Sequence, residues 1–165
     1  MKGVNKVSMV EFRSHIGNTI VYPCFWAVED NGNVFGLKSP DGHAVINVFT
    51  FTVAGSGSFE EFRDLMLSLA PGDWEESPWV DVDFVDTTAS KRHLLSPDED
   101  AAFSWEGSSY RLYAQQNGEC YHAILLEARP IVMQLNGDFF EEFIRSFRGI
   151  AAVRGPRPAS NAEGE

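Results

Sequence analysis

Hydrophobic and polar residues alternate along much of the first third of the chain, which is the pattern of β-strands. The clearest strand is predicted at 43–53, where Ala44, Ile46 and Val48 lie on one side and Val45 begins the other. Both sides are apolar near its start, so we expect this strand in the centre of a sheet. Further strands are predicted at 19–26, 34–38, 80–84 and 131–135.

Apolar residues spaced three and four apart predict two amphipathic helices. Both contain the same four residues, Phe-Glu-Glu-Phe, at 59–62 and at 140–143. Ser58 is the expected N-cap of the first helix. Asp138 is the expected cap of the second, after a turn at 136–137. We interpret the shared phrase as two solutions to one packing problem, with both Phe faces in the core.

The region between the two helices is predicted to hold a hairpin and a long loop. An Asn-Gly turn at 117–118 separates two strand-like stretches, 109–115 and 120–127, which together predict a β-hairpin. The stretch 86–100 is polar and irregular, and we expect a long loop there with at most a short helix.

The order of elements is strands, helix, strands, helix. This order predicts an α+β protein with a mostly antiparallel β-sheet and helices packed on it. The length and a hydrophobic content of 44% suit a single domain with a real core. We place that domain at 1–152 and expect the segment 153–165 to be a disordered tail because of its composition.

The formal net charge of −11 narrows the classes of partner. Nucleic acids and anionic membrane surfaces attract basic proteins, so we expect no nucleic-acid partner and no membrane. The charge is compatible with a basic protein partner, or with solubility alone.

Cysteine usage and targeting signals indicate a cytoplasmic protein. The chain has two cysteines, with no zinc-binding spacing and too few for a disulfide scaffold. The first residues have no apolar signal-peptide core, and no apolar run reaches the ~20 residues that span a bilayer. The common hydrolase and metalloprotease motifs are absent, so we expect no enzyme, no cofactor and no metal.

The strongest candidate for a binding site is an acidic segment, 73–106. It holds ten acids against two bases, a local formal charge of −8, and three tryptophans are interleaved with the acids. Charges steer a basic protein, and an exposed Trp can anchor it. The alternative is a solvated acidic face with the tryptophans in the core, which we favour for Trp79 and Trp105. The predicted partner-binding residues are Asp73, Trp74, Glu75, Glu76, Asp81, Asp83 and Asp86.

Two smaller groupings carry weaker hypotheses. Asp81, Asp83 and Asp86 could offer oxygen ligands to Mg²⁺ or Ca²⁺, but no calcium-loop pattern accompanies them. The Gly-Ser run at 55–58 precedes a helix, where backbone N–H groups can bind anions. It lacks both the Walker lysine and the dinucleotide fingerprint.

Cys120 and His122 lie on the same side of a predicted strand. A thiol nucleophile needs a neighbouring base, and Cys24 or His43 could also approach from another strand. A buried structural Cys beside a partly exposed His is the interpretation that we prefer.

Three short segments resemble the PsbP-like superfamily: Pro-Cys-Phe-Trp at 23–26, Ser-Pro-Asp-Gly at 39–42 before a long strand, and Phe-Ile-Arg-Ser-Phe-Arg at 143–148. The run 127–132 looks like a hairpin end of the bacterial Eag chaperones in this group. The resemblance implies an α-β-α sandwich around an antiparallel sheet, and non-enzymatic work. Known members include a Ran-binding nuclear import factor, photosystem extrinsic subunits and the Eag chaperones.

These observations lead to one main hypothesis and three alternatives. The main hypothesis is a protein-binding module, in the form of a bacterial immunity protein that neutralises a cognate toxin through the acidic, Trp-bearing face. The alternatives are a cytoplasmic Eag-type chaperone for a secreted effector, a Cys/His-dependent enzyme, and a small-ligand binder that uses Phe-lined space between sheet and helices.

Overall fold

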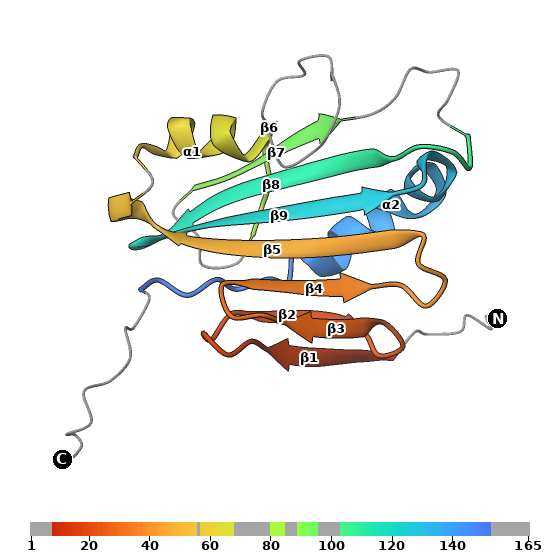
Figure 1. Ribbon diagram of the computed structural model, residues 1–165, viewed down its shortest axis with the longest axis horizontal. Helices are drawn as coiled ribbons and strands as arrows, with labels where there is room; N and C mark the ends of the chain where they lie inside the picture. The colour runs from red at the N-terminus through yellow and green to blue at the C-terminus, as the bar shows by residue number, and fades with distance from the viewer. Residues whose placement is uncertain (1–7, 56, 68–79, 85–88, 96–102, 153–165) are drawn as a thin grey trace.

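The architecture comes from a computed structural model, which describes residues 8–55, 57–67, 80–84, 89–95 and 103–152 (Figure 1). For the strand at 89–95 only the backbone is described. The predicted tail at 153–165 lies outside the described residues.

Seven of the nine described strands form one sheet in which all neighbouring strands are antiparallel (Figure 1). The strand order is β3-β4-β5-β9-β8-β7-β6, and a separate two-stranded sheet pairs β1 with β2. The strands are β1 Met9–Arg13, β2 Thr19–Pro23, β3 Ala27–Asp30, β4 Val34–Lys38, β5 Ala44–Thr52, β6 Val80–Asp81, β7 Ala89–Leu95, β8 Ser109–Asn117 and β9 Cys120–Ala128.

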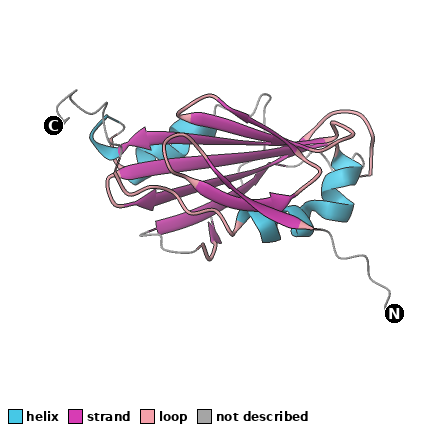
Figure 2. Ribbon diagram, turned by 90° about the horizontal axis from the view of Figure 1, so that it is seen from below, coloured by secondary structure: helices cyan, strands magenta, loops and turns pink. Residues whose placement is uncertain are grey.

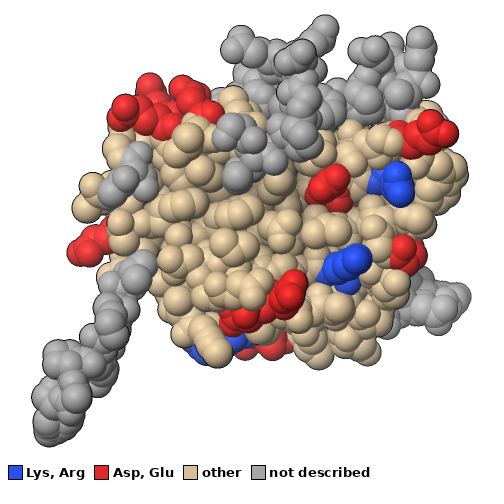
Figure 3. Space-filling model, in the orientation of Figure 1, with Lys and Arg blue, Asp and Glu red and all other residues tan. Residues whose placement is uncertain are grey.

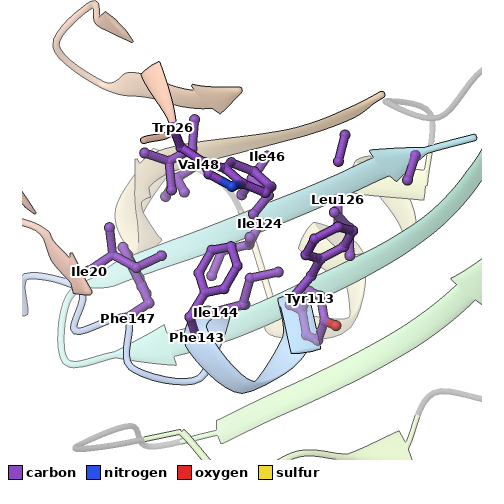
Figure 4. Packing of buried hydrophobic residues seen from close by; sticks show 14 of the residues in the cluster. Ile20, Trp26, Ile46, Val48, Tyr113, Ile124, Leu126, Phe143, Ile144 and Phe147 are labelled. Carbon is purple, nitrogen blue, oxygen red and sulfur yellow. The ribbon is translucent and has the colours of Figure 1, made fainter. Parts of the chain in front are cut away.

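The larger core lies between one face of this sheet and helix α2, Pro130–Ile144 (Figure 4). Alternate residues of β5 and β9 point into it, and β2 adds Ile20 from the small sheet. Burial of this apolar surface is the main stabilising term of the fold. The core includes Ile20, Trp26, Ile46, Val48, Tyr113, Ile124, Leu126, Phe143, Ile144 and Phe147.

Helix α1, Phe59–Met66, covers part of the opposite face of the sheet. Its Phe62 is fully buried and stacks on Tyr121 of β9, with 4.7 Å between ring centroids. Helical segments therefore lie on both sides of the strands (Figure 2). The result is an α+β protein with layers in the order helix, antiparallel sheet, helix.

A polar clamp attaches α2 to strand β8. Arg111 Nη1 donates to the carbonyl oxygen of Gly137 at 3.1 Å and to Glu141 Oε1 at 3.3 Å. The Tyr113 hydroxyl donates to the same Glu141 oxygen at 2.7 Å. Burial and the neighbouring carboxylate raise the pKa of Tyr113, so it stays a donor. These hydrogen bonds fasten α2 to strand β8 of the sheet.

Several predicted elements are confirmed. β4 has the predicted bounds, β5 lies in the middle of the sheet between β4 and β9, and β8 with β9 forms the predicted hairpin. The Ser58 hydroxyl accepts from the Glu61 N–H, and Glu61 accepts from the Ser58 N–H, so the capping box at the start of α1 is present. The strands predicted at 19–26 and 80–84 are shorter, ending at Pro23 and Asp81.

The prediction of a strand at 131–135, a turn at 136–137 and a cap at Asp138 was wrong, because α2 runs without interruption from Pro130. Pro130 occupies the first helical turn, where its missing N–H is not needed. Gly137 does not turn the chain. A Cβ there would lie 2.7 Å from Arg111 Nη2, so the glycine makes room for the clamp.

The prediction of a long loop at 86–100 was also wrong in part. Residues 89–95 form β7, which pairs with β8 in an antiparallel ladder. Its sequence, Ala-Ser-Lys-Arg-His-Leu-Leu, has no alternation that would mark a strand. Backbone hydrogen bonds to β8 stabilise it, and these do not depend on side-chain pattern.

Candidate functional site

A cleft with a volume of about 320 Å³ lies beside α2. Four parts of the chain line it: the segment after β2, the turn between β4 and β5, the segment before β8, and the N-terminal two-thirds of α2. We call it the aromatic cleft. Its floor is formed by Trp26 and Phe140, and its rim by Phe25, Trp105, Leu135 and Phe139.

The floor of the aromatic cleft is continuous with the main core. Trp26 and Phe140 are each only 6% exposed. The Trp26 ring meets the edges of Phe140 and Phe143, with centroid distances of 5.5 Å and 5.3 Å. Figure 4 shows Trp26 and Phe143 within this packed group. The floor is therefore part of the close-packed core.

The rim residues are exposed despite their apolar character. Leu135 is 70% exposed, Trp105 57%, Phe25 54% and Phe139 39%. Leu135 and Phe139 are four residues apart on α2, so they lie on the same side of the helix. Exposed apolar side chains grouped around a concavity are typical of interaction sites.

Two contacts hold Trp105 at the rim. The Ile131 N–H donates to the Ser104 carbonyl oxygen at 3.0 Å, which ties the segment before β8 to the first turn of α2. The ring of His43 lies 5.3 Å from that of Trp105. The preference for a core position of Trp105 was therefore wrong. Its indole lies at the surface, beside the first turn of α2.

One carboxylate borders the aromatic cleft. Asp41 Oδ1 accepts from the Ser39 hydroxyl at 2.7 Å and from the His43 N–H at 2.9 Å. These hydrogen bonds, that of His43 first, lower the pKa of Asp41 and keep it ionised. Within the described part of the chain, no Lys or Arg lines the cleft.

The predicted acidic site lies mostly outside the described residues. Asp73, Trp74, Glu75, Glu76 and Asp86 all fall there, and so does Trp79.

The two described members of the predicted acidic site, Asp81 and Asp83, are exposed. In the β6–β7 ladder, Asp81 and Lys91 are register partners along the backbone. Figure 3 shows acidic side chains at the corner over α1 and a largely uncharged surface over the central strands.

Cys120 and His122 are both fully buried, so His122 is less exposed than we expected. Thr50 Oγ1 lies 2.9 Å from His122 Nδ1, and His122 Nε2 lies 2.9 Å from the Ile150 carbonyl oxygen. Asn18 completes the ring, because its side chain donates to Thr50 and accepts from the Ile150 N–H.

The bonding pattern assigns the proton of His122. Thr50 accepts from Asn18 and donates to Nδ1, so Nε2 carries the hydrogen and donates to Ile150. Burial lowers the pKa of His122 to about 4. Both nitrogens are engaged and the ring is neutral, an arrangement that suits structure and not general-base catalysis. Cys24 is exposed.

The geometry of the described residues does not support the predicted cation site or the predicted anion site. In the described part of the chain no group of three or more His, Cys, Asp or Glu side chains could hold a metal ion. Glu61 accepts from the Ser58 N–H at the start of α1, where an anion would bind.

Among the described helices, none has the length and apolar character of a membrane span.

Sequence reasoning missed the aromatic cleft. The adjacent pair Phe25-Trp26 and the i, i+4 pair Leu135 and Phe139 were the available signals. The second signal was hidden because Leu135 was assigned to a predicted strand at 131–135 and Phe139 to a helix after a turn at 136–137, so the two were not expected on one helix face. Trp105 was identified in the sequence, but whether it is buried or exposed depends on contacts with residues distant in sequence, such as His43.

Comparison with known proteins gives a fold and no closer relationship. No family model and no curated protein matches the chain. Among solved structures, CyanoP, the cyanobacterial PsbP from Synechocystis sp. PCC 6803, aligns with a TM-score of 0.60 at 13% identity, over 91% of this chain and 97% of its own. The chain has the PsbP-like fold.

A second solved structure has the same fold. The Ran-binding protein Mog1p from Saccharomyces cerevisiae aligns with a TM-score of 0.54 at 14% identity, over 87% of this chain and 96% of its own. The PsbP-like resemblance seen in the sequence is thus confirmed at the level of the fold. At these identities the comparison carries the architecture alone.

Proposed function

We propose that this chain is a non-catalytic protein-binding module whose partner docks in the aromatic cleft. The observation that carries this proposal is the set of four exposed apolar rim residues around a concavity. Trp and Phe side chains at the rim supply large contact areas for a partner. Mog1p, which has the same fold, is a Ran-binding protein, so a protein of this fold can bind another protein.

Affinity capture with the full chain tests this function. A lysate of the organism that encodes the chain is passed over the wild type and over the double variant Trp105→Ala/Leu135→Ser. We expect a protein bound in stoichiometric amount by the wild type and reduced at least about tenfold by the double variant, because hot-spot side chains dominate affinity.

The control for this capture is Leu65→Ser, which also removes an exposed apolar side chain, 59% exposed, but on α1. It should retain the partner. Thermal melts should show that all three chains are folded. The proposal fails if no stoichiometric protein is recovered, or if the double variant retains it as well as the control does.

The specific role that we propose is that of a bacterial immunity protein, which binds a cognate toxin. The net charge of −11 and the acidic segment 73–106 support a basic partner, since charge complementarity raises association rates and excludes acidic competitors. Co-expression tests the role directly: the chain should restore growth of cells that produce the captured partner. Failure to protect them would exclude immunity.

A chaperone for a secreted effector is the second candidate, favoured by the apolar character of the aromatic cleft. The dependence of binding on ionic strength distinguishes the immunity role from the chaperone role. Binding to a basic toxin through charge should weaken as ionic strength rises, whereas binding of an apolar effector segment should persist.

A further inference from the structure

We propose that the aromatic cleft recognises an apolar segment of its partner that presents an arginine or lysine, and that Asp41 binds this cation. This inference rests on the proposed function, since it names the chemistry of what docks there. Its basis is the position of one carboxylate in a site that is otherwise apolar and aromatic.

Two hydrogen bonds orient the carboxylate of Asp41. It lies in the turn between β4 and β5, and the Ser39 hydroxyl and the His43 N–H both bind its Oδ1. In the described part of the chain no hydrogen bond involves its Oδ2, and the residue is exposed. An incoming guanidinium or ammonium group can therefore bind Oδ2 without disturbing the turn.

No described Lys or Arg lines the cleft, and the described ion pairs do not include Asp41. Two other bases lie nearby: His43 lines the cleft, and Lys38 Cε would be 3.5 Å from a Cβ on Gly42. Among the described lining residues, Asp41 is the only acid and there is no Lys or Arg. An acidic segment would meet a carboxylate of like charge at the cleft, which is unfavourable.

The rim supplies the second half of the recognition. Phe25, Trp105 and Phe139 offer exposed ring faces, and a cation within about 6 Å of a ring centroid is attracted to it. Arg fits best, because its planar group can stack on a ring and bind a carboxylate at the same time. The apolar neighbours of that residue would cover Leu135 and the Trp26 edge of the floor.

Random linear peptides displayed on phage provide the probe. Selection uses the full wild-type chain, and clones that also bind Trp105→Ala/Leu135→Ser are removed. We expect the remaining peptides to combine apolar or aromatic residues with one Arg or Lys. Replacing that residue by neutral citrulline or norleucine in synthetic peptides should weaken binding about three- to fivefold, as for an exposed ion pair.

Variants of the protein provide the reciprocal test. Asp41→Asn keeps an Oδ1 acceptor for Ser39 and His43, so the turn is preserved. This variant should bind the Arg-containing peptides about three- to fivefold more weakly than the wild type, and its affinity for the neutral peptides should be unchanged. The control Glu142→Gln removes an exposed acid of α2 that does not line the cleft, and should change neither.

The outcomes separate the inference from the proposed function. Cleft-dependent peptides without a basic residue, or an Arg preference that survives Asp41→Asn, overturn the inference and leave the protein-binding module intact. If no selected peptide depends on Trp105 and Leu135, the cleft is not the docking site and both fail. Because the citrulline comparison uses unaltered protein, a folding defect of a variant cannot decide the result.

Discussion

At the scale of single residues, His122 shows how a polar group can be essential to a core. It lies among apolar rings, 5.4 Å from Phe147, and both its nitrogens are bound. A Cβ at Gly149 would overlap the imidazole, so the glycine allows the chain to pass over it. The ring of hydrogen bonds fastens the residues around Ile150 to β5 and β9.

The burial of His122 predicts a pH dependence of stability. The pKa is lowered from 6.5 in the unfolded chain to about 4 in the folded one. Between these values the unfolded chain binds a proton that the native protein does not. The contribution is therefore complete above pH 6.5 and is lost as the pH falls towards 4, by about 3 kcal/mol in the free energy of unfolding.

Urea unfolding of the wild type and of His122→Gln across this pH range measures the effect. The wild type should lose more stability on acidification, and the difference between the two chains isolates His122 from the carboxylates. His15→Gln, at an exposed position, is the control for the loss of one histidine. Equal pH dependence of wild type and His122→Gln would contradict the assignment of a buried neutral ring.

At the scale of elements, α1 depends on one side chain. Phe62 is fully buried between Tyr121 and Phe51, whose ring centroid is 5.7 Å away. Phe62→Ala should lower the free energy of unfolding by about 3–5 kcal/mol, because the lost contacts leave a cavity. Leu65→Ala removes a side chain of the same helix that is 59% exposed, and should change it by less than about 0.5 kcal/mol.

Chemical denaturation of both α1 variants checks this prediction. A loss in Phe62→Ala no larger than in Leu65→Ala would mean that α1 is not packed on the sheet. Far-UV circular dichroism should stay close to that of the wild type for both chains, since α1 holds only 8 residues.

The same scale explains which elements could be predicted. β5, the β8–β9 hairpin and α1 carry complete local signals: alternation, an Asn-Gly turn and a capping box. The start of α2 was missed because Pro130 and Gly137 have two meanings in sequence. Each breaks structure in most contexts, but here Pro130 opens a helix and Gly137 makes room for Arg111. For Gly137, the contact with Arg111 of β8 is visible only in the folded structure.

At the scale of the whole molecule, the charge of −11 should govern how fast a basic partner associates. We expect the association rate constant of the partner captured by the wild type to fall about tenfold between ionic strengths of about 0.01 M and 0.15 M. Asp81→Asn/Asp83→Asn should lower it further at low salt, if the acidic segment faces the partner.

The matched control for this variant is Glu60→Gln/Asp64→Asn, which removes two exposed acids from α1 and gives the same net charge. Stopped-flow association with each variant measures the rates. Equal losses in the two variants would mean that the overall field and not the acidic segment steers the partner. No loss in either would exclude electrostatic steering.

The sequence by itself determined the class of fold, the central strand, the hairpin and the acidic character, because these follow from local periodicity and from counting charges. The tertiary structure alone decided where the aromatic side chains lie. Trp26 and Phe140 became a floor, while Phe25, Trp105, Leu135 and Phe139 became a rim. These six residues come from three segments that together span more than a hundred positions of the chain, and only the packing of α2 against the sheet brings them together.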